Sequence, residues 1–305
     1  MVEFCATDVG KLQDAQLYKR GWGGDTSNFA IAVARLGGRC GYICRIGDDG
    51  FGRSFLSLWQ TENVDTSQVI IERDGYTAVY FISLLSNGRH DFTYLRKDSA
   101  ASHYSPSDLN EEFLREARLF HSSGITLALS QSCREAVLRG AEIVKGSGGI
   151  FSFDVNYRPK LWPQDIARSH IEKAIEAADL VFASEEDLND LYSQDIDDVV
   201  DRIYSIAEPK LLVIKLGSEG CSLVYEKERA HVPGFDVTVV DTTGAGDAFD
   251  GAFVLGFLKG WSSVKSATFA NAAGALTTTG LGAVTPIPTS GEVDDFFRSR
   301  GMSSL

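Results

Sequence analysis

The stretch Asp241-Thr-Thr-Gly-Ala-Gly-Asp247 is followed directly by Ala-Phe-Asp-Gly-Ala-Phe-Val-Leu-Gly-Phe-Leu. The second part is small and apolar at helical spacing, which predicts a buried helix with the glycines at or just before its N-terminus. Gly244 and Gly246 allow a ligand to approach the backbone closely, and free N–H groups at a helix N-terminus bind anions. The stretch therefore predicts an anion-binding turn that also contains the carboxylate of Asp247.

Such a turn suits phosphoryl transfer. The backbone N–H groups of Gly244, Ala245 and Gly246 would stabilise the charge that develops on a transferred phosphoryl group. Asp247 would accept the proton of the attacking hydroxyl as a general base. The alternative is a glycine-rich turn in which Asp247 only caps the helix. The chain contains neither GxxxxGK[ST] nor GxGxxG, so phosphate binding depends on this stretch.

The composition restricts the partners and the location of the protein. The chain has 305 residues, of which 44% are hydrophobic, and its formal net charge is -13. This acidity argues against nucleic acid or an anionic membrane as a partner. The sequence has no membrane-length apolar run and no signal peptide, so we expect a soluble, cytoplasmic protein. We interpret the five cysteines as reduced thiols, since no CxxC pair occurs among Cys5, Cys40, Cys44, Cys133 and Cys221.

Short apolar runs alternate with amphipathic stretches from about Arg118 onward. The runs are apolar on both faces, which is typical of strands in a covered parallel sheet. The alternation predicts a doubly wound α/β fold, in which helices flank a mainly parallel sheet and ligands bind beyond the carboxyl ends of the strands. The predicted strands are 117–121, 149–154, 179–182 and 211–215, and the predicted helices are 131–145 and 165–178.

Residues 76–96 interrupt this alternation. Two predicted strands are joined there by Ser86-Asn87-Gly88, and Asn-Gly is a strong hairpin signal because a type I′ turn needs positive φ at both central residues. We interpret the hairpin as a small protruding lid with strands at about 8–20 and 76–97, inserted in a single domain of residues 1–305. The exposed edge of such a lid also predicts a homo-oligomer formed through it.

Two segments of this chain resemble signatures of the ribokinase-like (PfkB) carbohydrate kinases. The first is Asp-Thr-Thr-Gly-Ala-Gly-Asp-Ala-Phe from Asp241, and the second is Gly23-Gly24-Asp-Thr-Ser-Asn28-Phe-Ala-Ile-Ala-Val-Ala-Arg-Leu-Gly-Gly. Residues 45–52 and 280–288 match as well, so the resemblance covers nearly the whole chain in the right order. It implies a ribokinase-like fold with ATP and Mg²⁺, and it leaves open a monovalent cation near Asp241.

The residues themselves also explain the second segment. Gly23-Gly24 precede apolar residues at helical spacing, so a helix is expected to begin there, with Thr26 or Ser27 as its cap. Asp25 and Asn28 would face outward at the start of the helix and bind sugar hydroxyls. The alternative is that these side chains only cap the helix.

Within this family the chain most resembles the 2-keto-3-deoxygluconate kinases. The resemblance is carried by Tyr80, by the run from Arg89 to Ala101 and by Asp154-Val-Asn-Tyr-Arg158-Pro-Lys-Leu-Trp162. A guanidinium pairs bidentately with a carboxylate, which independently favours a sugar acid. The alternatives are surface ion pairs for the arginines and lid core for the tyrosines. The resemblance implies substrate contacts by Gly23, Gly24, Asp25, Asn28, Tyr80, Tyr94, Arg96, Arg158 and Asp247.

The same resemblance implies a nucleotide site along the carboxyl edge of the sheet. A plain strand–turn–strand is the alternative for residues 217–220. Mg²⁺ would bridge phosphate oxygens and use few protein ligands, so we assign no metal-binding residue. The expected ATP contacts are Asn156, Arg158, Ser184, Lys215, Gly217, Ser218, Gly220, Gly244, Gly246 and Asn271.

Two features depart from the family pattern. Family members often carry Asn-x-x-Glu after the central strand, whereas this chain has Ser184-x-x-Asp187. In the family, the Asn-x-x-Glu residues are linked to the positioning of metal and phosphate. In this chain Glu186 or Asp187 would take that role, acting through water. Relatives also have a full first strand ending in Gly-Glu before the Met-Val-Glu-Phe-Cys of this chain. We therefore expect the front half of that strand to be absent, which would affect substrate contacts near Asp8.

The sequence thus predicts ATP-dependent phosphorylation of 2-keto-3-deoxygluconate to its 6-phosphate, with Asp247 as base. A fructokinase or another sugar kinase of the same fold is the near alternative, and a nucleoside kinase is a more distant one. A non-catalytic sugar-acid sensor built on a kinase fold is the alternative from another class, since it would bind ligand without ATP turnover. The expected partners are therefore a small sugar acid and ATP.

Overall fold

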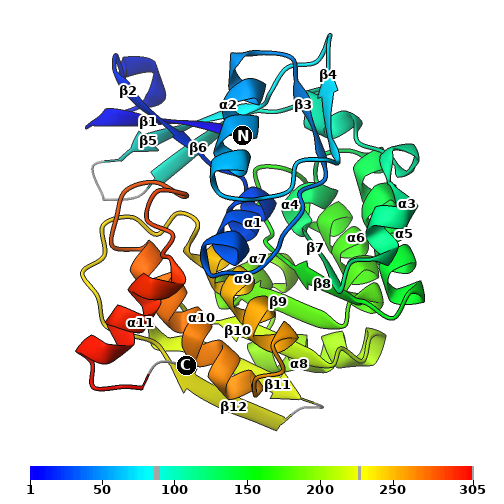
Figure 1. Ribbon diagram of the computed structural model, residues 1–305, viewed down its shortest axis with the longest axis vertical. Coiled ribbons are helices and arrows are strands. Elements are labelled where there is room, and N and C mark those ends of the chain that lie inside the picture. The colour runs from blue at the N-terminus through cyan, green and yellow to red at the C-terminus, as the bar shows by residue number, and fades with distance from the viewer. Residues whose placement is uncertain (86–89, 226–227, 304–305) are drawn as a thin grey trace.

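The computed structural model describes residues 1–85, 90–225 and 228–303. A large sheet is flanked by helices, and a smaller sheet projects from one end of the molecule (Figure 1). Within the described residues, no helix combines the length and the hydropathy needed to cross a bilayer.

The large sheet is six-stranded with the order β12-β11-β10-β9-β8-β7. Its four strands from β7 to β10 run parallel, and β11 and β12 add an antiparallel hairpin at one edge. This arrangement confirms the predicted mainly parallel sheet. The strands are β7 (Leu119–Ser123), β8 (Ile150–Asp154), β9 (Leu180–Ser184), β10 (Leu211–Lys215), β11 (Gly220–Tyr225) and β12 (Glu228–Pro233).

Alternation along the central strands supplies two hydrophobic cores. In β9, Val181 and Ala183 pack into one core, whereas Leu180 and Phe182 pack into the other. Because successive side chains of a strand point to opposite faces, both faces must be covered by helices, as in a doubly wound fold. One face holds α5 (Gln131–Gly146), α6 (Gln164–Ala177), α7 (Glu185–Tyr192) and α8 (Ile196–Ile206). The other holds α1 (Asp25–Arg35), α9 (Ala245–Leu258), α10 (Ser263–Thr277) and α11 (Ser290–Ser299).

The smaller sheet, which we call the lid sheet, has the strand order β2-β1-β5-β6. Its strands are β1 (Val2–Val9), β2 (Tyr18–Trp22), β5 (Val79–Leu84) and β6 (His90–Leu95). The predicted lid strand at 8–20 is wrong, because most of that stretch is the connection between β1 and β2, including a 3-10 turn at Leu12–Asp14. The hairpin signal Ser86-Asn87-Gly88 lies outside the described residues.

The first strand of the chain belongs to the lid sheet. β1 is antiparallel to β2 and parallel to β5, and among the described strands it pairs with none of the large sheet. A separate parallel pair, β3 (Cys44–Gly47) and β4 (Val69–Glu72), lies beside α2 (Gly50–Thr61). The remaining short elements are α3 (Glu111–Arg115), α4 (Gly124–Leu127) and the 3-10 turns Ala100–His103, Pro106–Asp108 and Gly217–Glu219.

Replacement of Phe253 tests the hydrophobic packing that holds α9 on the sheet. Its side chain is fully buried and meets the ring of Phe182 edge to face at a centroid distance of 5.4 Å. We expect Phe253→Ala to lower the free energy of unfolding by about 3–5 kcal/mol, because the truncated side chain leaves a cavity. Urea denaturation measures this change. Ile166→Ala, at a side chain that is 47% exposed, is the control and should cost less than about 0.5 kcal/mol; equal losses would contradict the packing.

Candidate active site

The turn before α9 has an open N-terminus. Gly244 is the N-cap with a φ of 80°, and a Cβ at this position would lie 2.6 Å from the carbonyl oxygen of Ala283. No side chain caps the helix, so N–H groups of its first turn are available to a ligand. Asp247 is the third residue of α9 and not its cap, which excludes the capping alternative. The structure therefore has an open helix start at Gly244, Ala245 and Gly246, and the binding of an anion there stays a prediction.

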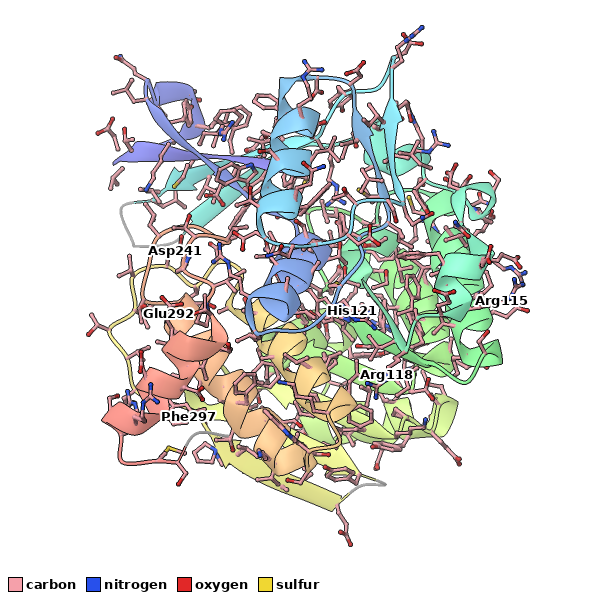
Figure 2. The ribbon with its side chains drawn as sticks, viewed as in Figure 1. Arg115, Arg118, His121, Asp241, Glu292 and Phe297 are labelled. Carbon is pink, nitrogen blue, oxygen red and sulfur yellow. The ribbon has the colours of Figure 1, made fainter. Side chains whose placement is uncertain are left out.

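Asp241 fixes the shape of this turn. Its carboxylate accepts hydrogen bonds from the backbone N–H of Thr243 at 3.0 Å and from the backbone N–H of Gly282 at 2.9 Å. Figure 2 shows Asp241 in the loop that lies next to the lid sheet. One carboxylate thus joins the glycine turn to the later segment around Ala283, which packs directly against Gly244.

Asn28 and Asp247 meet although they are 219 residues apart in the sequence. The side-chain amide of Asn28 donates to Oδ2 of Asp247 at 2.8 Å. Asn28 is only 3% exposed, so the expectation that it faces outward is wrong. The reason is that α1 packs beside α9 on the same face of the sheet, which brings the first residues of α1 to the start of α9.

The cap predicted for α1 is also wrong. Gly24 is the N-cap with a φ of 126°, and the hydroxyls of Thr26 and Ser27 are used in tertiary contacts instead. The hydroxyl of Ser27 accepts from the indole N–H of Trp59 at 2.8 Å, and that of Thr26 is bonded to the hydroxyl of Tyr42. The hydroxyls of Thr26 and Ser27 thus hydrogen-bond to aromatic side chains of the core, while Gly24 adopts the positive φ at the start of the helix.

Burial changes the acidity of Asp247. Loss of solvent around the carboxylate, and secondly the nearby negative charge of Asp25, raise its pKa to about 7. The hydrogen bond from Asn28 and the positive charge of Lys215 act in the opposite direction. A carboxylate with a pKa near neutrality can both take and release a proton at physiological pH, as a general base requires.

Asp25 lies beside this carboxylate. Its Oδ2 accepts a hydrogen bond from the hydroxyl of Ser123, at the carboxyl end of β7. Two carboxylates, Asp25 and Asp247, therefore stand near each other at the junction of α1 and α9. Such oxygens accept hydrogen bonds from hydroxyl groups, which fits the predicted binding of a polyhydroxylated ligand.

On the lid side, Tyr80 is committed to a protein partner. Its hydroxyl donates to Oε2 of Glu3 at 2.5 Å, and both side chains are buried. Gly23 packs so closely that a Cβ there would lie 2.1 Å from the Tyr80 hydroxyl oxygen. Burial, and also the charge of Asp241, raise the pKa of Glu3. Sequence reasoning missed Glu3, although a carboxylate among the apolar residues at the start of the chain was a usable signal.

Arg96 and Tyr94 stand at the end of β6, facing the same region. The ring of Tyr94 lies 6.1 Å from that of Tyr80. Arg96 donates from Nη2 to the carbonyl of Ile125 at 3.3 Å, while its Nη1 is buried without a partner. Burial lowers the pKa of Arg96, and the carboxylate of Asp25 opposes this effect. A buried guanidinium with an unused donor is costly unless a ligand completes its hydrogen bonds.

Arg158 belongs to an ion pair with Asp187. The two side chains approach to 2.6 Å, and Asp187 is itself buried. The hydroxyl of Ser184 accepts from the N–H of Asp187 and caps α7. In this chain Ser184-x-x-Asp187 therefore starts a helix and holds Arg158. The expected action of Asp187 through water on the ligand stays a prediction. The ion-pair alternative describes Arg158 better.

Several residues predicted to contact the nucleotide also have structural roles. The amide nitrogen of Asn271 donates to the carbonyls of Val232 and Pro233 and so serves to hold β12. Residues 217–220 form the turn between β10 and β11, with Gly217 and Ser218 exposed, as the strand–turn–strand alternative described. A Cβ at Gly220 would lie 2.1 Å from the carbonyl of Val232, so this glycine allows close packing. Lys215, in contrast, reaches the start of α9.

Some of the buried polar atoms that have no protein partner belong to predicted site residues or to Asp154 beside them. They include Oδ1 of Asn28, Nη1 of Arg96, Oδ1 of Asp154 and Oδ1 of Asn156. Asp154 is the last residue of β8, and Asn156, two residues later, has a positive φ of 34°. Orphaned polar atoms and strained backbone at one sheet edge indicate a ligand site.

The oxygens of Asp154 and Asn156 fit Mg²⁺, because this hard cation prefers oxygen ligands and keeps most of its shell as water and phosphate. No cluster of three or more His, Cys, Asp or Glu side chains that could hold a metal occurs within the described residues. The arrangement therefore suits a metal that arrives with a polyphosphate better than a metal held by the protein alone.

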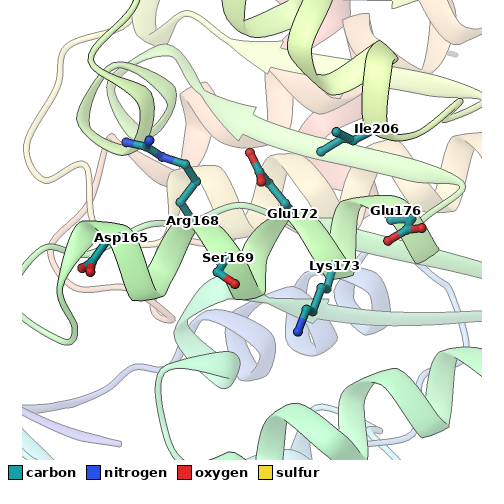
Figure 3. A pocket seen from close by; sticks show the side chains of 7 residues that line it. All are labelled: Asp165, Arg168, Ser169, Glu172, Lys173, Glu176 and Ile206. Carbon is teal, nitrogen blue, oxygen red and sulfur yellow. The ribbon is translucent and has the colours of Figure 1, made fainter.

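A surface hollow beside α6 is unrelated to these residues (Figure 3). It is lined by polar and charged side chains of α6 and by Ile206, and two of these side chains bond to other elements. Arg168 donates to the carbonyl of Leu191, and Glu172 accepts from Arg202. The hollow consequently adds nothing to the site around Asp247.

Comparisons with known proteins agree with this geometry. A family model described as pfkB family carbohydrate kinase matches residues 1–290. Fructokinase-1 of Zea mays is 38% identical over 304 residues, covering 96% of this chain and 94% of that protein. The structure of a fructokinase with bound ATP from Xylella fastidiosa superposes with a TM-score of 0.90 at 26% identity, over 99% of this chain and 96% of its own. An aminoimidazole riboside kinase from Salmonella enterica, complexed with aminoimidazole riboside and an ATP analog, gives 0.85 at 31% identity, over 97% and 96% of the two chains.

The pKa of Asp247 has a consequence for stability. Because the folded state raises this pKa from 3.8 to about 7, the protonated carboxyl is favoured on folding, and stability is lost as pH rises from about 4 to about 7. Asp247→Asn removes the ionisable group. We expect this variant to match the wild type near pH 4 and to exceed its free energy of unfolding by a few kcal/mol above pH 7. Denaturation curves across this range measure the difference, and a difference independent of pH would contradict a raised pKa.

Proposed function

The chain belongs to the pfkB family of carbohydrate kinases, and we propose that it transfers the γ-phosphoryl group of ATP to a hydroxyl of a small sugar acid of the 2-keto-3-deoxygluconate type. The observation that carries the choice of a sugar acid is the buried Nη1 of Arg96, which has no protein partner. A carboxylate would satisfy this donor and neutralise the guanidinium. Tyr94, on β6 two residues before Arg96, would contribute a hydroxyl.

The reaction proceeds in line. The acceptor hydroxyl oxygen forms a bond to the γ-phosphorus of ATP while the bond from that phosphorus to the β,γ-bridging oxygen breaks, and ADP leaves. Asp247 takes the proton of the hydroxyl, assisted by a pKa near 7. N–H groups of the turn from Gly244 to Gly246 face the charge that spreads over the equatorial oxygens. Asp154 and Asn156 would hold the Mg²⁺ that arrives with ATP. The ion would neutralise negative charge on the β- and γ-phosphate oxygens.

The residues around the acceptor also have distinct tasks in this proposal. Asn28 holds the carboxylate of Asp247 in place through the 2.8 Å hydrogen bond. Ser123 donates to Oδ2 of Asp25, and the other carboxylate oxygen of Asp25 accepts a hydrogen bond from a sugar hydroxyl. The lid sheet covers the acceptor and keeps water away, since water would otherwise compete for the phosphoryl group.

Fructose is the second candidate acceptor. It is favoured by the fructokinase relatives, which cover almost the whole chain at 33–38% identity. A neutral sugar would satisfy Arg96 through hydroxyl groups, which are weaker partners for a guanidinium than a carboxylate is. The two candidates therefore differ in how strongly activity depends on the charge of Arg96.

Replacement of Asp247 tests the transfer mechanism. We expect Asp247→Asn to lower kcat by roughly 10²–10⁴-fold while changing KM little, because the amide cannot accept the proton but keeps the size of the side chain. A coupled assay of ADP release over a panel of sugars and sugar acids measures both constants. Asp165→Asn, at an exposed position of α6, is the control. Wild-type protein that binds a sugar acid without ADP release would instead support the sensor alternative.

Replacement of Arg96 tests the acceptor. We expect Arg96→Met to lower kcat/KM for 2-keto-3-deoxygluconate by about 10- to 100-fold, the value of a hydrogen-bonded charge pair, and to change kcat/KM for fructose less than about threefold. The same assay on both acceptors gives the ratio. Arg139→Met on α5, where the arginine pairs with Glu111 and Glu142, is the control for loss of a charge. Equal losses on both acceptors would overturn the carboxylate role of Arg96.

A further inference from the structure

Three charged side chains meet below the glycine turn. The ammonium of Lys215, at the end of β10, lies 3.0 Å from Oδ2 of Asp154, at the end of β8. It also lies 3.1 Å and 3.0 Å from the two carboxylate oxygens of Asp250, in α9. The side chains are 13%, 4% and 1% exposed, respectively, so all three polar groups are removed from water. Burial, and secondly the charge of Asp154, raise the pKa of Asp250, whereas Lys215 acts in the opposite direction.

This cluster is adjacent to the anion-binding turn. A Cβ placed on Gly246 would lie 3.4 Å from Nζ of Lys215. Asp250 follows Asp247 by three residues, and residues with that spacing are neighbours on a helix surface. The ammonium therefore stands against the first turn of α9, where the transferred phosphoryl group would bind in the proposed function.

The position is unfavourable for a cation in the absence of a ligand. A helix N-terminus carries partial positive charge, and burial removes the hydration of the ammonium. Burial acts to lower the pKa of Lys215, but Asp154 and Asp250 outweigh it and raise the pKa, so the group stays charged. A buried ion cluster seldom stabilises a fold more than apolar side chains of the same volume would. The cluster is therefore better explained by the anion it faces than by stability.

The two carboxylates are not equivalent. Asp154 uses only Oδ2 on Lys215, and its Oδ1 is a buried atom without a partner. Asp250 directs both of its oxygens to Lys215. Asp250 is also the single charged residue after Asp247 in the otherwise apolar helix α9. Its placement thus serves Lys215, whereas that of Asp154 leaves one oxygen for a ligand.

We propose that Asp250 is a positioning residue that fixes the ammonium of Lys215 against the start of α9, where it stabilises the phosphate groups of ATP during transfer. The inference rests on the proposed function, because it takes ATP as the anion. Asp250 itself touches no substrate in this proposal and acts through Lys215 alone. Replacement of Asp250 should consequently matter only while Lys215 is present.

A double-mutant cycle tests this dependence with Asp250→Asn, Lys215→Met and the double variant. The measurements are the melting temperature, kcat and KM for the best acceptor of the panel, and the Kd of Mg·ATP by calorimetry. We expect Asp250→Asn alone to lower kcat and weaken Mg·ATP binding about tenfold, with KM for the acceptor within about twofold. In the Lys215→Met background the same substitution should change kcat and Kd less than about twofold. Asp165→Asn on α6 is the control.

Equal losses in both backgrounds would show that Asp250 acts independently of Lys215 and would overturn the inference. A lower melting temperature with unchanged kcat and Kd would assign the cluster to stability and would also overturn it. Wild-type protein that releases no ADP with any acceptor would count against the proposed function. In that case the Mg·ATP affinities of the wild type and the three variants still decide the inference, because their measurement needs no acceptor. A loss of affinity on Asp250→Asn only when Lys215 is present supports the inference. A loss of the same size without Lys215, or no loss at all, refutes it.

Discussion

The hydrogen bond between Asn28 and Asp247 is the contact on which the site depends. A carboxylate enclosed by protein must be satisfied by donors or become protonated, and here one amide provides the donor at 2.8 Å. The bond joins the first residues of α1 to the first turn of α9. In the proposed function, it would therefore connect the residues that bind the acceptor to those that face the phosphoryl group. The raised pKa of Asp247 follows from the same enclosure. Burial therefore supplies both the geometry and the basicity that a proton acceptor needs.

The carboxyl edge of the sheet concentrates charge that the rest of the core avoids. Both faces of the sheet are covered with apolar side chains, whereas Asp154, Lys215 and Asp250 meet at one end of it. In the proposed function, a phosphoryl group beside Gly246 would meet the ammonium of Lys215 and the free N–H groups of the helix start. Its negative charge would offset the positive potential that the helix start and Lys215 create together. The proposed anion would therefore complete this arrangement of charges.

The fold was largely predictable because apolar runs on both faces of a sheet require helices on both sides. The strand Leu211–Lys215 was predicted to the residue, and the α9 start followed from its glycines. The site was less predictable, because hydrogen bonds between distant segments leave no local pattern. Spacing in α1 alone could not show that Asn28 turns inward, since that depends on α9, which lies about two hundred residues away. Asp250 and Glu3 were visible as carboxylates in apolar surroundings, but their partners Lys215 and Tyr80 come from other elements.

The lid sheet narrows what the acceptor can be. Two tyrosines and two arginines were expected to hold the sugar acid. Of these, Tyr80 donates its hydroxyl hydrogen bond to Glu3 and Arg158 is paired with Asp187, so both already have protein partners. Arg96 and Tyr94 remain, and only Arg96 retains a buried donor without an acceptor. Recognition of a carboxylate would then rest on one guanidinium and not on a cluster of cations. The guanidinium of Arg96 would bind a carboxylate more strongly than a hydroxyl, but it would not exclude a hydroxyl. Arg96, just after β6, would therefore favour a sugar acid over a neutral sugar without making the enzyme specific for it.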